Sequence, residues 1–522
     1  QTKNQKYMNG AQALIQTLVN GNVDVCFMNP GTSEMHFVAA LDDVPEMRSV
    51  LALFEGVATA AADGYARMAG KPAATLLHLG PGLGNGFAML HNARRSFTPV
   101  INVVGDHASW HLKYDAPLTS DIVSIADPVS KWIKSSASSD AIGPDTAEAI
   151  QAALGNPNGI STLILPGDTA WNESSVGPVV SIPQPAAPTF HADAVENVAK
   201  ILASGEPTLL VLGNRAIRTE VSLLANRLGQ GTGATIMAGR PTGRLERGAG
   251  RPILKRIPYP IPQAVQKLEP FKYIVLIDAH PPIGFFGYPN LPSELWQPGT
   301  QVHRLTEHGE DSAGALEALC ELLNVGDDLG PMAELDQPDL PTGELSIEKV
   351  WQGIAALMPD QTILSDESLT SGRSSEFFMT TAPQHDVLSG TGGAIGGGLP
   401  LAVGAAVACP DRQVINPQAD GSAMYSIQAL WTMARENLDI VSIIWNNRAY
   451  RILEGELEKV GASADTPKAQ AMLNLDNPEL NFAEMANGMG VEGTRVGSAD
   501  EFCKVLQGAI EKSGPHLIEV LV

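Results

Sequence analysis

Short apolar runs rich in β-branched residues alternate along the whole chain with segments of helical spacing. In the first part, runs at residues 23–31, 74–82 and 98–106 lead into loops of Gly, Pro, Asn or Asp, and an Ala-rich helix is expected over residues 55–70. Strand, loop and helix in rotation indicate parallel sheets flanked by helices, the α/β class. Such sheets bind ligands at the carboxyl ends of their strands.

Two proline-rich breaks divide the 522 residues into three segments. The stretches GPVVSIPQPAAPTF (177–190) and LDQPDLPTGELS (335–346) are typical of linkers. We therefore expect three α/β domains, each with its own parallel sheet. Their predicted bounds are residues 1–176, 190–334 and 346–522.

Charge and cysteine usage exclude several classes of partner. The formal net charge of −23 makes the chain a poor binder of nucleic acid. No apolar run approaches the ~18 residues needed to span a bilayer, so no membrane contact is expected. Four scattered cysteines without a CxxC pair indicate a reducing cytoplasm. The N-terminus, QTKNQKYMNG, has no apolar signal-peptide core, and Met8 is a plausible natural start.

The stretch ADGSAMYSIQALWTMARENLDIVSIIWNNRAY (419–450) places polar residues at the ends of two expected strands. Asp420 follows the run RQVINPQA, Asn447 follows IVSIIWN, and a helix is expected between them over residues 425–437. A strand–helix–strand unit brings both residues to one edge of two parallel strands. Their side-chain oxygens can share Mg²⁺, which commonly completes its shell with phosphate oxygens.

This stretch resembles the cofactor motif of thiamine-diphosphate enzymes, which begins GDG and ends NN. The match is close to benzoylformate decarboxylase and to acetolactate synthase large subunits, although Ala419 stands where the family usually has Gly. The resemblance implies that thiamine diphosphate is held through Mg²⁺ on Asp420, Asn447 and the backbone carbonyl of Ala449. Gly421 and Ser422, which open the helix, offer backbone N–H groups to an anion. Tyr450, in the same motif, is a further expected cofactor contact.

Two upstream loops match the same family. SGTGGAIGGGLPLAVGAA (389–406) opens a helix, but it lacks the strand and acidic residue of a dinucleotide fingerprint. The resemblance implies that Ile395 lies under the cofactor and forces its two rings into a V, and that the carbonyl of Gly393 accepts the 4′-amino hydrogen. SDESLTSG resembles the diphosphate loop, with Leu369 (through its backbone) and Thr370 as the implied phosphate contacts.

LFEGVATAAADGYARMAGKPAATLLHLGPGLGN (53–85) is similar to the pyrimidine-domain signature of the family. Glu55 opens an otherwise apolar helix, where a carboxylate is also favoured simply by the helix dipole. The resemblance implies that Glu55 hydrogen-bonds N1′ of the aminopyrimidine and so activates the cofactor. The cofactor then acts as the electron sink for loss of CO₂ from a 2-oxo acid.

Two further residues match the decarboxylase pattern. Thr32, in NPGTSE, falls where benzoylformate decarboxylase has a pocket serine, and His78, in LHLGPG, matches its pocket histidine. Acetolactate synthases typically lack this histidine but carry a similar GPG. Decarboxylases of this type also use a second histidine from the middle domain. This chain offers Phe285 and Phe286 there, with His280 several positions away.

We therefore expect an acetolactate-synthase-like carboligase that converts pyruvate to acetolactate. The alternative is a benzoylformate-type 2-oxo acid decarboxylase that releases an aldehyde. A cofactor-binding protein without turnover is disfavoured, because Glu55, Asp420 and Asn447 are all present. In the family each active site lies between two subunits, which implies a homodimer or homotetramer. Some synthases carry FAD in the middle domain, but this chain is short for that group and no FAD is expected.

Overall fold

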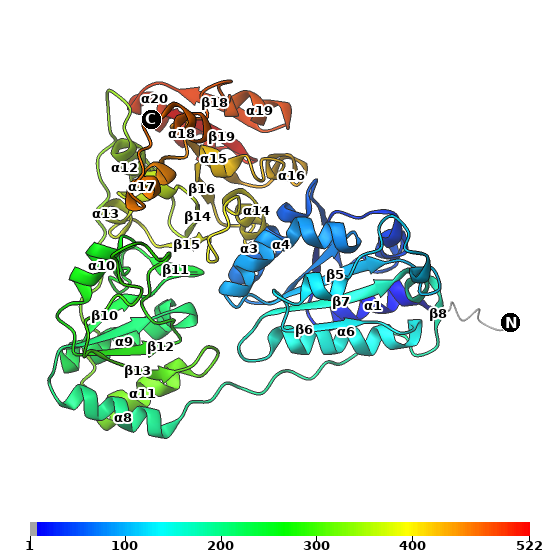
Figure 1. Cartoon of the computed structure of the whole chain (residues 1–522), viewed down its shortest axis with the longest axis horizontal. Coiled ribbons are helices and arrows are strands. Elements are labelled where there is room, and N and C mark those ends of the chain that lie inside the picture. Colours follow the sequence, from blue (N-terminus) through cyan, green and yellow to red (C-terminus); the bar gives the residue numbers. More distant parts are fainter. Residues whose placement is uncertain (1–7) are drawn as a thin grey trace.

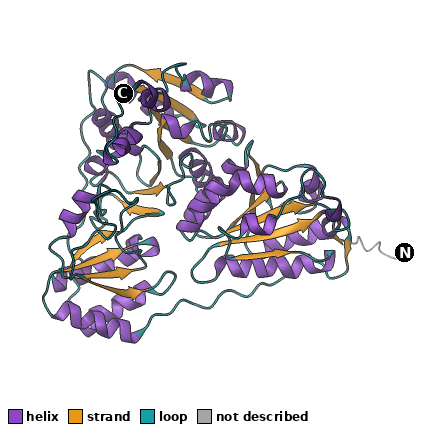
Figure 2. Cartoon of the chain, viewed as in Figure 1, coloured by secondary structure: helices purple, strands orange, loops and turns teal. Residues whose placement is uncertain are grey.

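The computed structural model of the chain describes residues 8–522, which form three large sheets with helices packed on their faces (Figure 1 and Figure 2). A short antiparallel pair, β1 (Met8–Asn9) and β8 (Glu173–Ser174), makes a fourth sheet. The predicted α/β class is confirmed. Most of the N-terminus assessed for a signal peptide, residues 1–7, lies outside the described residues. Within residues 8–522, none of the helices combines the length and the hydropathy needed to cross a bilayer.

The first sheet has the strand order β3-β2-β4-β5-β7-β6, and all its strands are parallel. Helices α3 and α4 cover one face, and α1 and α6 cover the other. The Gly/Pro stretch at residues 80–82, expected to be a loop, instead forms part of the first turn of α4. The elements are β2 (Val25–Met28), β3 (Arg48–Leu51), β4 (Ala73–Leu77), β5 (Val100–Asp106), β6 (Trp132–Ser135), β7 (Ile160–Pro166), α1 (Gly10–Asn20), α3 (Glu55–Ala69), α4 (Leu79–Arg95) and α6 (Ser139–Leu154).

The second sheet is smaller and also parallel, with the order β10-β9-β12-β13. The chain reaches it through residues 177–190, which contain neither helix nor strand, as the proline-rich composition predicts. The elements are β9 (Thr208–Leu212), β10 (Thr235–Ala238), β12 (Tyr273–Ile277), β13 (Gln301–Thr306), α8 (Ala192–Ala203), α9 (Thr219–Thr232), α10 (Ile261–Leu268) and α11 (Ser312–Leu322).

The third sheet has the order β11-β15-β14-β16-β17-β19-β18. It is parallel except at its edge, where β11 runs antiparallel to β15 although its residues lie between strands of the second sheet in the chain. The helix expected over residues 425–437 is shorter, because it begins at residue 429 and a separate turn, α15, starts at Asp420. The elements are β11 (Arg244–Arg247), β14 (Thr362–Asp366), β15 (His385–Ser389), β16 (Val414–Ala419), β17 (Ile440–Asn446), β18 (Glu492–Val496), β19 (His516–Leu521), α12 (Ile347–Leu357), α14 (Gly398–Ala408), α15 (Asp420–Ala423), α16 (Ala429–Arg435), α17 (Arg451–Lys459) and α20 (Ala499–Glu511).

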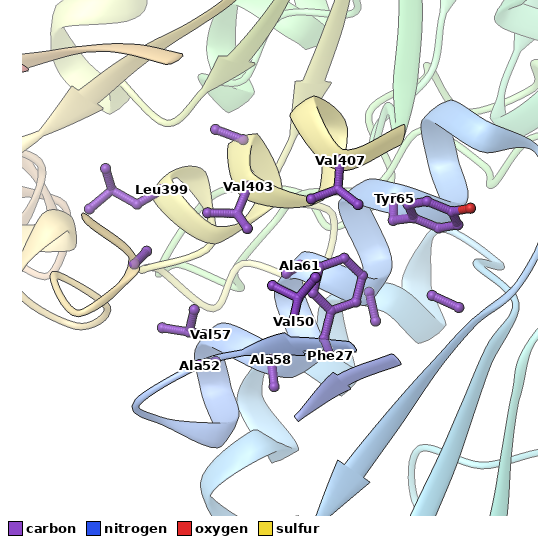
Figure 3. Packing of buried hydrophobic residues seen from close by; sticks show 14 of the residues in the cluster. Phe27, Val50, Ala52, Val57, Ala58, Ala61, Tyr65, Leu399, Val403 and Val407 are labelled. Atoms are coloured by element: carbon purple, nitrogen blue, oxygen red, sulfur yellow. The ribbon is translucent and has the colours of Figure 1, made fainter. Parts of the chain in front are cut away.

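Helices α3 and α14 join the first and third sheets through one apolar core (Figure 3). Their backbones lie in direct contact: a Cβ on Gly404 would overlap the carbonyl of Ala61, and a Cβ on Gly64 would overlap that of Leu401. Every residue of α3 from Glu55 to Met68 is buried as a result, which explains its alanine-rich composition. The side chains that Figure 3 labels across this contact are Val57, Ala58, Ala61 and Tyr65 of α3 and Leu399, Val403 and Val407 of α14.

Candidate active site

Asp420 and Asn447 lie at the carboxyl ends of β16 and β17, which pair in parallel. The N–H of Arg448 donates to Oδ2 of Asp420 at 2.7 Å, so the chain after β17 reaches the Asp420 carboxylate directly. The other oxygen, Oδ1, accepts from the N–H of Gly421 at 2.7 Å. The N–H of Ala449 donates to Oδ1 of Asn447 at 2.9 Å. The structure thus brings together the residues predicted to share a metal ion.

Of the two adjacent asparagines, Asn446 is turned into the protein. Its side chain is buried, and its Nδ2 donates to Oε1 of Glu519 at 2.7 Å. Successive residues at a strand end face opposite sides. Asn447 is therefore the asparagine left at the open edge, where a ligand can reach it.

The donor set at this edge fits a hard divalent cation. Burial raises the pKa of Asp420, although neighbouring backbone N–H groups lower it. A buried carboxylate is costly without compensation, which a cation would provide. Residues 8–522 contain no group of three or more His, Cys, Asp or Glu side chains able to hold a metal. A metal here would depend on amide, carbonyl and phosphate oxygens besides the one carboxylate, which suits Mg²⁺.

Three other predicted cofactor contacts lie at the same edge. Tyr450 lies over α15 so closely that a Cβ on Gly421 would overlap its ring, which accounts for the glycine. Leu369 and Thr370 open a short 3-10 helix after β14, the strand on the other side of β16. Leu369 has φ +50° and is 40% exposed. Its backbone therefore takes a conformation that non-glycine residues rarely adopt, in a loop open to solvent.

The second group of predicted residues gathers at the carboxyl edge of the first sheet. Glu55, the first residue of α3, is buried, and its Oε2 accepts from Nδ2 of Asn85 at 2.9 Å. A Cβ on Gly82 would lie 3.1 Å from Oε1 of Glu55 and 3.3 Å from Cβ of His78. Glu55 and His78 therefore flank the same glycine. No pattern in the sequence predicts that Asn85 is a partner of Glu55.

Two family models match the parts of the chain that contain these two groups of residues. The family described as thiamine pyrophosphate enzyme, C-terminal TPP binding domain, matches residues 370–520, and its N-terminal counterpart matches residues 8–125. IlvX of Mycobacterium tuberculosis, whose name describes a candidate acetolactate synthase large subunit, is 50% identical over 99% of each chain. The chain belongs to the thiamine-pyrophosphate enzymes.

Other relatives of this thiamine-pyrophosphate enzyme carry different names. Benzoylformate decarboxylase of Pseudomonas aeruginosa is 31% identical over 95% of each chain. The solved structure of a thiamine-diphosphate-dependent 4-hydroxybenzoylformate decarboxylase from Rhodococcus jostii superposes with a TM-score of 0.86 over 99% of both chains, at 24% identity. That structure shows the same fold, and the sequence relatives show a family that contains both synthases and decarboxylases.

In this thiamine-pyrophosphate enzyme His78 is paired with a residue that the sequence analysis missed. Nδ1 of His78 lies 2.8 Å from Oε2 of Glu34, which also accepts from the N–H of Gly31. Burial raises the pKa of Glu34, and its contacts with Gly31 and His78 lower it. A Cβ on Gly105 would overlap Oε1 of Glu34. Thr32 is exposed in the same turn, two residues before Glu34.

The position expected to carry a second histidine holds an aromatic side chain. A Cβ on Gly393 would lie only 2.6 Å from Cζ of Phe285, so this ring rests on the glycine loop that includes Ile395. Phe286 packs edge-to-face on Phe285, with ring centroids 4.8 Å apart. Both rings are more than half exposed. Gly393 itself has φ +83°, a conformation that favours glycine.

His280 does not take the place of that second histidine at the glycine loop. Its ring lies 4.5 Å from that of His308 and 6.3 Å from that of Phe97, measured between centroids. His308 in turn contacts the buried Asp278, at the carboxyl end of β12. His280 therefore belongs to a cluster at the edge of the middle sheet.

Proposed function

We propose that this enzyme decarboxylates a 2-oxo acid and joins the remaining fragment to a second 2-oxo acid, with pyruvate to acetolactate as the specific reaction. The observation that carries this proposal is the contact of Phe285 with Gly393. Benzoylformate-type decarboxylases are expected to place a histidine in this region. An apolar ring there removes one of the two groups able to deliver a proton to the product carbon.

The resemblance to the family, together with the positions of the residues at the two sheet edges, supports the following roles. Thiamine diphosphate supplies the electron sink that makes loss of CO₂ feasible. Asp420, Asn447 and the carbonyl of Ala449 would hold its diphosphate through Mg²⁺. Glu55, buried and oriented by Asn85, would hydrogen-bond the aminopyrimidine. These residues bind and orient the cofactor, whereas the residues beside the substrate decide the product.

The fate of the product carbon depends on proton donors. After CO₂ leaves, this carbon is either protonated, which releases an aldehyde, or bonded to a second carbonyl compound, which gives a ligated product. Protonation needs an acid placed within hydrogen-bond reach. Here His78 is the only one of the two expected histidines present, and Phe285 makes its side of the pocket apolar. Because a phenyl ring cannot donate a proton, fewer acids can reach the product carbon, and this favours ligation.

Aldehyde release is the second candidate, and one observation favours it. His78 has a buried carboxylate partner in Glu34, 2.8 Å from Nδ1, which supports a role for this imidazole in proton transfer. The relative named benzoylformate decarboxylase agrees with this alternative. Under it, His78 alone would protonate the product carbon, and the substrate would be an aromatic 2-oxo acid.

We also propose that the active site forms between two subunits. Glu55 and His78 lie at the edge of the first sheet, and Asp420 lies at the edge of the third. In the proposed homodimer or homotetramer, Glu55 of one subunit faces the cofactor held by Asp420 of another. Mixing an inactive Glu55→Gln variant with an inactive Asp420→Ala variant should then restore part of the activity through mixed dimers.

Product analysis tests the proposed function. Purified enzyme with Mg²⁺ and thiamine diphosphate is incubated with pyruvate, 2-oxobutyrate and benzoylformate, and the products are identified by mass. The proposal expects acetolactate from pyruvate, in excess over acetaldehyde. Clean conversion of benzoylformate to benzaldehyde, with pyruvate left unconsumed, would establish the second candidate instead.

A further inference from the structure

Glu367 is a buried carboxylate whose side chain accepts four hydrogen bonds. Oε1 accepts from the N–H groups of Gly396 at 2.9 Å and Gly397 at 3.2 Å. Oε2 accepts from the N–H of Gly398 at 3.0 Å and from Nε2 of Gln418 at 2.8 Å. These donors are neutral, so the carboxylate is compensated by hydrogen bonds rather than by an ion pair.

Gln418 extends this network to the metal-binding edge. Its Nε2 donates both to Glu367 and, at 2.7 Å, to Oγ of Ser422 in α15, the turn that begins at Asp420. The backbone of Glu367 also pairs with β16 on both sides of Gln418. Its N–H donates to the carbonyl of Pro417 at 2.9 Å, and its carbonyl accepts from the N–H of Ala419 at 3.0 Å.

The glycine loop at residues 396–398 packs tightly against this network. A Cβ on Gly398 would overlap Oε1 of Gln418 and lie 2.8 Å from Cβ of Glu367. The carbonyl of Gly398 accepts from Oγ of Ser365 at 2.7 Å. Movement of the loop relative to β14 and β16 would therefore break several hydrogen bonds at once.

Three segments predicted to hold the cofactor thus meet at one side chain. Glu367 binds the loop that carries Ile395, contacts the turn of Asp420 through Gln418, and lies two residues before Leu369. A carboxylate suits this position because it accepts hydrogen bonds on both oxygens, whereas a carboxamide accepts on only one.

We propose that Glu367 is a positioning residue that sets the separation between the loop under the aminopyrimidine and the edge that binds the metal and diphosphate. This role rests on the cofactor binding described under the proposed function, but not on which product is released. Glu367 would hold the loop of Ile395 in the position where the family resemblance implies that Ile395 supports the cofactor. The distance between the two ends of the cofactor site is then fixed by hydrogen bonds inside one subunit.

The variant Glu367→Gln tests this role. In either orientation of the new side chain, its NH2 group faces two of the four donors. Two of the four hydrogen bonds are therefore lost, and N–H groups point at one another. We expect the folded variant to bind Mg²⁺-thiamine diphosphate about 10- to 100-fold more weakly, as for loss of hydrogen bonds to a charged group. We also expect slower hydrogen–deuterium exchange at C2 of the bound cofactor, although Glu55 is intact.

A double variant keeps the test decisive if Glu367→Gln folds poorly. In E367Q/Q418E the amide of residue 367 can donate to the new carboxylate while its oxygen still accepts from Gly396 and Gly397. Folding, cofactor affinity and C2 exchange should recover in part. Asp386→Asn is a matched control, because Asp386 is a buried carboxylate of the same sheet on β15, bonded to Arg244 and Arg412. It should lower the melting temperature without slowing C2 exchange.

Two results would overturn the proposal. One is a folded Glu367→Gln enzyme with wild-type cofactor affinity and C2 exchange. The other is a well-folded double variant that binds and exchanges no better than the single variant. These measurements need no substrate, so failure of this proposal can be distinguished from failure of the proposed function. A wild-type enzyme that binds the cofactor normally but converts no 2-oxo acid would refute the proposed function alone.

Discussion

Nδ1 of His78 lies 2.8 Å from Oε2 of Glu34, whose side chain is fully buried. The other oxygen, Oε1, has no hydrogen-bond partner among residues 8–522. When Glu34 is ionised, Nδ1 of His78 carries the proton that joins the pair, which leaves Nε2 as the acceptor of the neutral ring. Glu34 therefore selects which nitrogen of His78 stays free, and in the proposed role of His78 this nitrogen would face the substrate.

Glu34→Gln should slow turnover without removing the histidine. The new side chain can still accept from Gly31 and His78 through its oxygen, but it no longer supplies a negative charge. We expect kcat to fall by about 10- to 100-fold, up to the low end for loss of an acid–base group, with KM little changed. The fall in kcat of His78→Ala, measured in parallel, gives the largest effect to be expected. An unchanged kcat in Glu34→Gln would exclude this role.

The pH dependence of stability gives a separate check on Glu34. Burial raises its pKa in the folded protein. A group with a raised pKa contributes stability that is fully present below its unfolded pKa, about 4.3, and is lost as pH rises through the folded value. The free energy of unfolding of the cofactor-free wild type, compared with that of Glu34→Gln, should therefore fall as the pH rises from about 4.3 through the pKa of Glu34 in the folded protein. Urea denaturation at a series of pH values measures it, and a constant difference would contradict the assignment.

Glu55→Gln should separate cofactor activation from cofactor binding. The amide keeps the shape of the side chain, but it cannot share a proton with N1′ of the aminopyrimidine as a carboxyl group can. We expect a loss in rate of at least about 100-fold, with thiamine diphosphate still bound. Hydrogen–deuterium exchange at C2 should slow in parallel. Exchange at the wild-type rate would refute the assignment of Glu55.

Asp420→Ala should remove tight cofactor binding, because it deletes the only carboxylate in the proposed metal set. Chelation of the wild-type enzyme should likewise abolish activity, and Mg²⁺ plus thiamine diphosphate should restore it. Asn446→Ala is a useful control, since this neighbouring side chain is turned toward Glu519. Full activity in rigorously cofactor-free protein would refute the metal assignment.

The neighbouring positions of Asp420 and Asn447 could be predicted from the sequence, because both residues belong to one local unit. Asp420 and Asn447 belong to one strand–helix–strand unit, and such a unit places both strand ends at one edge. The contact between Glu34 and His78 could not be predicted in this way. It joins the loops after β2 and β4, whose pairing depends on the order of the whole sheet.

The burial of Glu367 could not be predicted from the sequence either. In SDES (365–368), a glutamate between an aspartate and a serine is typical of a solvated turn, and nothing local predicts that it is buried. Its environment comes from the glycine loop about 30 residues later and from Gln418 on the next strand. Long-range packing also determines the conformation of the glycines in LHLGPG, which lie in the first turn of α4 rather than in a loop.

Phe285→His is the variant that distinguishes the two candidate functions. It places an imidazole against Gly393, where the apolar ring now lies, and so returns a proton donor to that side of the pocket. If lack of this donor favours ligation, the ratio of aldehyde to ligated product should rise by about 10-fold or more, within the range for a placed acid. Cofactor affinity should change little, because no predicted cofactor ligand is altered.

Phe286→His is the matched control for this variant. Phe286 packs on Phe285 with a centroid separation of 4.8 Å and has almost the same exposure, 54% against 55%, but it is not the ring that meets Gly393. An imidazole there adds the same chemical group on the same loop without the contact. Product ratios from pyruvate, measured by mass, should therefore shift in Phe285→His and stay near wild type in Phe286→His. Equal shifts in both variants, or in neither, would mean that the contact with Gly393 does not control the product.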